Sequence, residues 1–187
     1  MKIPIEVSAR HIHLNQKTFQ KLFSKSQLTK LRDISQPRQF AANETVDVEN
    51  DGKQITNVRI VGPFRDDNQL EISKTDAYVL GFNPPIRISG DIQNTPGVLI
   101  KGSQDEVKLD KGVIIAKRHL HISPEDADKI SLKHEQIISI RISSKRELIF
   151  NEVTVRSRSK IDKLAFHLDT DEANAADVKN GDFGEII

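Results

Sequence analysis

A five-residue motif occurs twice in this chain, and it limits the possible folds more than any other feature. It reads Arg-His-Ile-His-Leu at residues 10–14 and Arg-His-Leu-His-Ile at residues 118–122. Side chains alternate faces along a strand, so the two histidines of each copy lie on one face, about 7 Å apart, while the residue between them points to a core. Two imidazoles so placed can bind one metal ion, with Zn²⁺ the default. The repeat therefore predicts two metal centres, or one centre built from both copies.

The two copies stand in the same sequence context. Val7 and Ile115 belong to apolar runs that lead into the motifs, so each motif ends a predicted buried strand. A helix start follows each copy: Asn15 after the first, and Ser123 with Pro124 at the first helical position after the second. A single His-x-His pair on a strand is more often a solvated polar face than a ligand pair. Two copies between strand and helix favour a metal or anion site.

The composition excludes several classes of function. The 187 residues suit one domain or two small ones packed together. Lys and Arg total 28 against 27 Asp and Glu, so no basic field favours nucleic acid or an anionic membrane. The sequence contains no apolar run long enough to predict a membrane span. The absence of Cys excludes disulfides, thiolate zinc sites and a cysteine nucleophile.

The remaining pattern is mostly short strands. Three β-hairpins are predicted around turns at residues 50–52, 103–105 and 143–145. Helices are expected in only three places: after His13, after His121 and at Asp171–Val178. The sequence lacks the repeating strand–helix–strand pattern that would predict a parallel sheet. We therefore expect a mainly β fold of barrels or sandwiches capped by short helices.

Four further residues have side chains that can take part in metal or anion binding. His167 ends another strand; alone it would be structural, but beside four motif histidines it is a candidate third metal ligand. Glu71 stands in a β-like run and is either a surface strand residue or the carboxylate of a His-His-Glu zinc site. Arg65 is either a surface residue or the fork that binds an anionic substrate. His134 has no partner nearby in the sequence and is expected to be an exposed turn residue.

Seven ordered segments carry a resemblance to a known family. They are VSARHIHL (7–14), LTKLRDISQPRQFAANETV (28–46), VRIVGPFR (58–65), EISKTDA (71–77), PPIRISGD (84–91), GVIIAKRHLHISPEDA (112–127) and FHLDTDEANAA (166–176). With them, nearly the whole chain resembles the PduL-type phosphotransacylases, which are phosphate propanoyltransferases or phosphate acetyltransferases. So many ordered segments are far more specific than the His-x-His pairs alone. One departure is Arg38, where the family usually has Gly after Gln-Pro; it touches none of the expected ligands.

The resemblance implies a dinuclear zinc enzyme that moves an acyl group between coenzyme A and inorganic phosphate, with acyl phosphate as the other product. By matching motifs, one zinc would be held by His11, His13 and Glu71. The second zinc would be held by His119, His121 and His167. Arg65 falls on the catalytic, phosphate-binding arginine of the family. The positions that would contact coenzyme A are Val7, Ser8, Ala9, Arg59 and Asn174.

The resemblance also implies the architecture and the setting. The family fold is a pair of β-barrels capped by short α-helices, which here would place residues 1–9 and 117–187 in one discontinuous barrel and 10–116 in the other. The family further implies a homodimer. The first predicted strand begins close to Met1, so we expect no N-terminal extension of the kind that directs some relatives into bacterial microcompartments. This favours a cytoplasmic enzyme acting on acetyl-CoA over a compartment enzyme acting on propanoyl-CoA.

Without a cysteine to form an acyl-enzyme, we expect phosphate to attack the thioester directly within a ternary complex. Two other functions would use parts of the same residue set. A zinc hydrolase would cleave the thioester with water and would not need Arg65 for phosphate. A non-catalytic, zinc-stabilised binding module would have closed coordination and no anion-binding arginine. Arg65 and Glu71 lie in one short segment, which favours an open, anion-accepting site.

Overall fold

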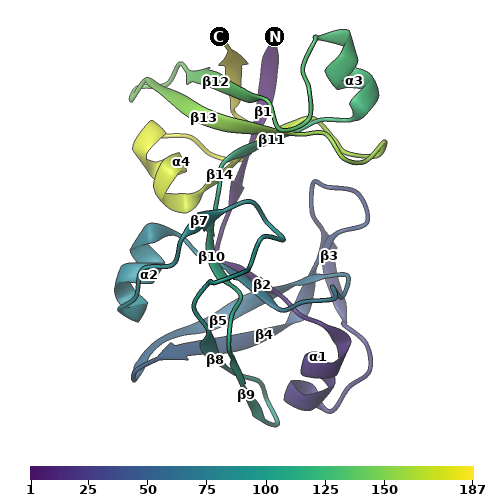
Figure 1. The fold of residues 1–187 in the computed structure, drawn as a ribbon, viewed down its shortest axis with the longest axis vertical. Helices are drawn as coiled ribbons and strands as arrows, with labels where there is room; N and C mark the ends of the chain where they lie inside the picture. Colours follow the sequence, from purple (N-terminus) through teal and green to yellow (C-terminus); the bar gives the residue numbers. More distant parts are fainter. The chain divides into compact units, whose positions relative to one another are not determined.

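The structure, a computed structural model, describes all residues from 1 to 187 and divides into two compact units. The first, here called the barrel unit, comprises Met1–Ala9, Ser35–Pro37 and Lys117–Ile187. The second, here called the sheet unit, comprises Arg10–Ile34 and Arg38–Ala116. Strands dominate both units, and the helices are short (Figure 1). The expectation of a mainly β fold with short helices is confirmed.

Six strands form the closed barrel of the barrel unit, and closure leaves no open sheet edge. In barrel order they are β1 (Lys2–Ser8), β14 (Ala165–Asp169), β11 (His119–His121), β13 (Leu148–Arg156), β12 (Ile137–Ile142) and β15 (Phe183–Ile186). Its helices are α3 (Pro124–Lys129) and α4 (Thr170–Ala176). Because β1 pairs with β15, the two ends of the chain lie side by side (Figure 1). Alternate strand residues such as Ile3, Leu120 and Phe166 fill the core.

The sheet unit is built on one nine-stranded sheet that is not closed. Its strands, in order, are β7 (Ile86–Arg87), β10 (Val113–Ala116), β6 (Gln69–Glu71), β2 (His11–His13), β5 (Lys53–Gly62), β4 (Phe40–Asn50), β8 (Val98–Lys101) and β9 (Glu106–Leu109), with β3 (Lys30–Asp33) paired to β4. Its helices are α1 (Gln16–Phe23) and α2 (Lys74–Leu80). Phe19 of α1 packs in one core with Ile12, Ile60 and Leu70 from the sheet.

The three predicted hairpins are present as β4–β5, β8–β9 and β12–β13. Asp51 and Gly52 both have positive φ in the first of them, as a tight hairpin turn requires. The three predicted helices are α1, α3 and α4, and none of the four helices is long and apolar enough to cross a membrane. Helix α2 was missed because its start is marked only by a short capping box, Ser73 with Asp76.

The expectation of no parallel pairing is wrong. Strand β2 runs parallel to β5, β11 parallel to β13, and β1 parallel to β14. A parallel pair requires a long crossover, and here the crossovers contain strands as well as a helix. The connection from β2 to β5 passes through α1, β3 and β4, so the simple strand–helix–strand rhythm never occurs in the sequence.

Arg38 lies in a turn with φ of 64°, in the left-handed region that favours glycine. The resemblance leads one to expect Gly at this position, and the backbone conformation gives the physical reason. The departure from the family pattern therefore concerns the strain of one turn residue.

Candidate metal centres and anion-binding residues

The first group of candidate ligands consists of His11 and His13 on β2 and Glu71 at the end of β6. The alternation predicted for the motif holds, because Ile12 is fully buried in the core between them. The antiparallel register places His11 opposite Glu71. One ligand atom from each of the three residues lies within 4.8 Å of the others. The structure thus brings together three residues that the sequence separates into two segments.

The spacing of these atoms suits a small metal ion. Oε2 of Glu71 is 3.7 Å from Nε2 of His11, and Oε1 is 3.7 Å from Nε2 of His13. Bonds of about 2.0–2.1 Å to a tetrahedral ion place neighbouring ligand atoms about 3.4 Å apart. The donors are therefore close to the separation that coordination needs.

The protonation states also suit a cation. Burial, and then the charges of His11 and Arg65, hold the pKa of His13 well below its usual value. Nδ1 of His13 donates to the Val61 carbonyl at 3.0 Å, which leaves the Nε2 lone pair for a metal. Burial would raise the pKa of Glu71, but His11, His13, Ser89 and Arg65 together lower it to about 2. At neutral pH the group presents a carboxylate and a neutral imidazole, the forms that bind metals.

Two buried residues that the sequence analysis missed hold Glu71 in place. Gln69 donates through Nε2 to Oε1 of Glu71 at 2.6 Å, and the Ser89 hydroxyl donates to the same oxygen at 2.8 Å. Gln69 is itself held, because its Oε1 accepts from the Gly90 N–H at 2.7 Å. A serine in a loop carries no spacing signal, so only the fold could reveal its role.

Arg65 belongs to the same polar network. Its Nη1 donates to the Ser89 hydroxyl at 3.1 Å, and its backbone N–H donates to the Leu14 carbonyl at 3.0 Å. Its positive charge contributes to the low pKa values of both His13 and Glu71. The Ser89 hydroxyl therefore links the guanidinium of Arg65 to the carboxylate of Glu71. Arg65 is half-buried and lies beside the first group.

The second group consists of His119 and His121 on β11 and His167 on β14. The antiparallel register places His119 opposite His167, and the ring centroids of the three histidines are 4.7 to 4.9 Å apart. Leu120, between the motif histidines, is fully buried. Nδ1 of His119 donates to the Lys117 carbonyl at 2.9 Å, which again leaves Nε2 for a metal.

Glu6 is a further missed residue, beside the second group. The parallel pairing of β1 with β14 places it next to His167, with Oε2 3.4 Å from His167 Nε2. The same carboxylate accepts a hydrogen bond from Ser35. Carboxylates beside metal-binding histidines commonly orient the imidazole ring. Nothing in the alternation of β1 distinguishes Glu6 from an ordinary outward-facing strand residue.

The residues expected to contact coenzyme A lie in both units. In the barrel unit the backbone N–H of Val7 donates to Oδ1 of Asn180 at 2.6 Å, Ser8 is half-buried, and Ala9 and Asn174 are exposed. In the sheet unit, Nη1 of Arg59 donates to the carbonyls of Ala42 and Asn43 at 3.0 and 2.9 Å. These two hydrogen bonds to the backbone of β4 hold the guanidinium group of Arg59 in position.

His134 is exposed, as expected, and the structure brings it partners from another part of the sequence. Its Nδ1 lies 3.3 Å from the Ser157 nitrogen and its Nε2 lies 3.3 Å from Nε of Arg158, and a neutral imidazole accepts a hydrogen bond from one of these two donors. These partners follow β13 and are distant from His134 in the sequence, so local spacing could not predict them. His134 belongs to neither group of candidate ligands.

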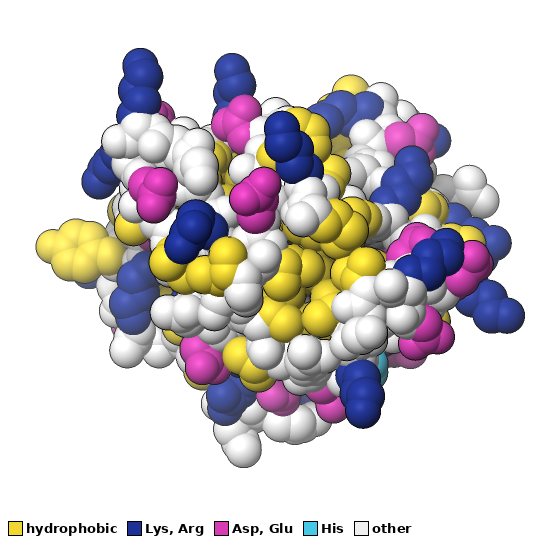
Figure 2. All heavy atoms as spheres, turned by 90° about the horizontal axis from the view of Figure 1, so that it is seen from above, with side chains coloured by type: hydrophobic (Ala, Val, Ile, Leu, Met, Phe, Trp, Pro, Cys, Tyr) yellow, Lys and Arg dark blue, Asp and Glu magenta, His cyan; other side chains and the backbone are white.

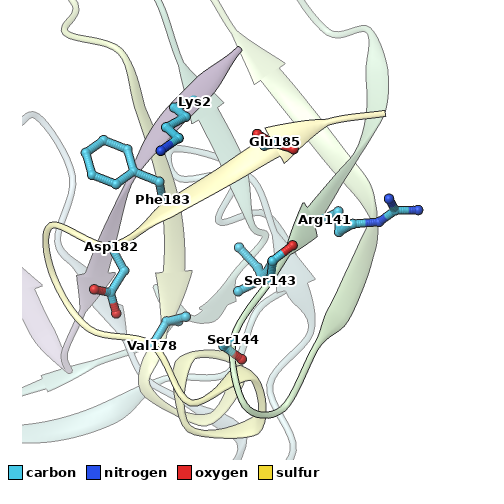
Figure 3. A pocket seen from close by; sticks show the side chains of 9 residues that line it. Lys2, Arg141, Ser143, Ser144, Val178, Asp182, Phe183 and Glu185 are labelled. Atoms are coloured by element: carbon cyan, nitrogen blue, oxygen red, sulfur yellow. The ribbon is translucent and has the colours of Figure 1, made fainter.

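A cavity of about 450 Å³ in the barrel unit is separate from this chemistry. Its lining residues are Lys2, Arg141, Ile142, Ser143, Ser144, Val178, Asp182, Phe183 and Glu185. Figure 3 shows Lys2 beside the ring of Phe183, and the Nζ of Lys2 is 5.9 Å from the ring centroid. The Arg141 guanidinium points away from the other labelled residues. None of the predicted site residues lines this cavity.

Comparison with known proteins agrees with the motifs. Residues 4–179 match the family model described as phosphate propanoyltransferase. A phosphate propanoyltransferase of Thermotoga maritima is 44% identical over 187 residues, covering 99% of this chain and 89% of the relative. One of Alkaliphilus metalliredigens is 44% identical, covering 100% and 88%, and one of Listeria monocytogenes is 41% identical, covering 99% and 87%. The resemblance is confirmed: the chain belongs to the phosphate propanoyltransferase family.

Proposed function

We propose that this protein is a zinc-dependent phosphate acyltransferase that moves a short acyl group between coenzyme A and inorganic phosphate. The observation that carries the proposal is the network in which Ser89 links Arg65 to Glu71. This network brings the guanidinium of Arg65 close to a His-His-Glu group, which supports a reaction between an anion such as phosphate and a thioester. Membership of the family supports the same reaction class.

Zinc fits the donor sets. Both groups offer three nitrogen or oxygen ligands, and the chain has no cysteine that would close a thiolate site. Three protein ligands with one position left open are typical of catalytic zinc. His11, His13 and Glu71 would hold one ion, and His119, His121 and His167 a second. A zinc ion bound there would stabilise negative charge on the thioester oxygen or on the departing thiolate.

The chain's own residues supply positioning. Phosphate is repelled by the phosphates of coenzyme A, and the guanidinium of Arg65 would offset that repulsion and aim one phosphate oxygen at the carbonyl carbon. The bond between the carbonyl carbon and the phosphate oxygen forms as the carbon–sulfur bond breaks, and coenzyme A leaves as the thiolate. Gln69 and Ser89 keep the Glu71 carboxylate fixed through this step. No cysteine thioester intermediate is available, so attack is direct.

For substrate binding, we propose contacts to coenzyme A by Val7, Ser8, Ala9, Arg59 and Asn174. Arg59, tethered by two carbonyls, would present a fixed positive charge to the phosphates of the coenzyme. We propose acetyl-CoA and propanoyl-CoA as the candidate acyl donors. Comparing kcat/KM for acetyl-, propanoyl- and octanoyl-CoA tests the preference for a short acyl chain, and the highest value for octanoyl-CoA would contradict it.

The purified protein is expected to hold about two zinc ions per chain, because the structure forms two separate three-donor groups. Elemental analysis of protein prepared with excess zinc and then desalted measures this number. A value of one or less under those conditions would contradict the dinuclear proposal.

We propose that the chain has two domains, and its division into the barrel unit and the sheet unit supports this proposal. The two units differ from the boundaries implied by the resemblance only at Ser35–Pro37, which join the barrel unit. Gln36 explains this, since its side chain makes two hydrogen bonds to the backbone of Lys163, at 3.1 and 3.2 Å. Each domain would then carry one metal centre.

We also propose a homodimer. The exposed large apolar side chains of the barrel unit are Met1, Ile137, Ile149, Ile161, Phe183 and Ile187. Figure 2 shows hydrophobic side chains gathered on one face of the molecule, between charged side chains. Apolar patches of this kind often mark protein contacts. Light scattering should give twice the chain mass of 21.1 kDa, and a mass of one chain at micromolar concentration would contradict the proposal.

A further inference from the structure

The arginine that opens each His-x-His motif makes the same kind of ion pair in both units. In the sheet unit, Nε of Arg10 donates to Oδ1 of Asp76 at 2.8 Å, and Nη2 is 2.6 Å from the same oxygen. In the barrel unit, Nη1 of Arg118 donates to Oε1 of Glu172 at 2.8 Å. Both acids occupy the third position of a helix, α2 and α4 respectively, and cap its first turn through a capping box. The two ion pairs are thus equivalent in position.

These two helices follow the strands that bring the third member of each group. Glu71 ends β6 and His167 lies near the end of β14, and in both cases the N-cap of the next helix is the next residue but one. The register is also the same, since the first histidine of each motif lies opposite the third member of its group. Each unit therefore builds its group on one common frame of two antiparallel strands, a helix start and an arginine.

We propose that Arg10 and Arg118 are positioning residues, which fix the third ligand of each metal centre against its His-x-His strand through Asp76 and Glu172. The inference rests on the proposed metal centres. The strands concerned are short: β2, β6 and β11 have 3 residues each, so few ladder hydrogen bonds hold their register. Metal ligands must be held to within about 0.5 Å. In each unit, the ion pair joins the arginine just before the first ligand to the helix just after the third ligand. It therefore holds the two strands that carry the ligands against each other.

Burial makes each acid depend on its arginine. The side chain of Asp76 is only 3% exposed and that of Glu172 is 22% exposed. Burial and the Asp169 carboxylate raise the pKa of Glu172 to about 6, whereas the charge and the hydrogen bond of Arg118 lower it. Without the arginine, a mostly buried carboxylate would keep only its hydrogen bond from the N-cap N–H, and the first turn of the helix would shift toward water. The third ligand, just before that turn, would shift with it.

The other two helices lack this arrangement. Helix α3 also has an acid at its third position, Asp126, but Lys129 of the same helix pairs with it at 2.8 Å. Helix α1 has no acid in its first turn. Neither helix follows a third ligand. An arginine just before a strand pairs with a helix acid only at the two places where a third ligand must be held. Lys129 provides a matched control.

The test measures the affinity of the full chain for Zn²⁺ alone, by competition with a chromogenic chelator. Arg118→Gln and Arg10→Gln are each expected to weaken one of the two bound ions by about 10-fold, the lower end of the effect of losing an outer partner of a metal site. Lys129→Gln, which breaks an ion pair of the same length at an equivalent helix position, should leave both affinities unchanged. Arg118→Lys should retain part of the affinity, and it also provides a readout if the glutamine variant does not fold.

A second background separates positioning from general loss of stability. In a His167→Ala protein only the sheet unit's centre remains, so adding Arg118→Gln should leave the affinity of that ion unchanged, while adding Arg10→Gln should weaken it. A merely structural role would produce no such division between units. The visible absorption of the Co²⁺-loaded protein should change for the affected centre only.

Three results would overturn the inference. They are unchanged Zn²⁺ affinities in both arginine variants, equal weakening of Zn²⁺ binding by Lys129→Gln, or weaker Zn²⁺ binding at the centre of the unit that does not carry the substitution. Failure of the proposed function is recognised separately, in the wild-type protein. If wild type binds no Zn²⁺, the metal centres and the inference both fall; if it binds two ions and the variants match it, the inference alone falls.

Discussion

Replacing His119 with alanine is expected to reduce acyl transfer by more than about 100-fold. Loss of an outer partner of a metal site already costs about 10- to 100-fold in metal affinity, and His119 is a proposed direct ligand. Its Nδ1 is fixed by the Lys117 carbonyl, and its ring stands 4.8 and 4.9 Å from those of His121 and His167, so its removal leaves this group with two candidate ligands. The measurement is the rate of acetyl phosphate formation together with the zinc content of the same preparation.

His134→Ala is the matched control for that substitution. His134 is exposed and belongs to neither group, and its contacts with Ser157 and Arg158 are both 3.3 Å long. Surface substitutions of this kind usually change the free energy of unfolding by less than about 0.5 kcal/mol. Activity should stay within about twofold of wild type, and both zinc ions should be retained. Equal loss of activity in the two variants would mean that the assignment of the histidines is wrong.

Arg65→Ala is expected to raise the apparent KM for phosphate by roughly 10- to 150-fold. A charge-assisted contact to an anion contributes about 1.5 to 3 kcal/mol, which corresponds to that range. Zinc content should not change, because Gln69 and Ser89 still hold Glu71 through Oε1. Steady-state kinetics with varied phosphate and varied acetyl-CoA measures the effect, and the KM for acetyl-CoA should change less.

Two further substitutions sharpen that experiment. Arg65→Lys restores the charge without the planar fork, so it should recover only part of the phosphate affinity. Arg32→Ala, which removes an exposed arginine on β3 of the same unit, should leave the KM for phosphate unchanged. If Arg65→Ala saturates with phosphate at the same concentration as wild type, the phosphate site lies elsewhere.

The two His-x-His pairs, and the buried residue inside each pair, could be predicted from the sequence because strand alternation is a local property. His11, Ile12 and His13 needed only their own spacing, and the structure places Ile12 in the core as expected. The proximity of these histidines to Glu71 depends on the antiparallel register of β2 with β6. Spacing along the chain does not predict that register. The resemblance supplied this grouping from matched motifs.

The residues that support the ligands could not be predicted in this way. Ser89 lies in a loop and Glu6 on an alternating strand, and each acts through a partner distant in the sequence. The parallel pairs were missed for a related reason, since their crossovers include other strands. Asp76 at the start of α2 was missed because one turn of capping residues is a weak local signal.

The most direct test of the proposed function measures the release of thiol from acetyl-CoA by the zinc-loaded protein, with and without inorganic phosphate. Acetyl phosphate is measured in the same samples. Under the proposed function, thiol release depends on phosphate, and one acetyl phosphate forms for each thiol released. Thiol release at the same rate without phosphate, with no acetyl phosphate formed, would contradict it and identify the protein as a thioester hydrolase.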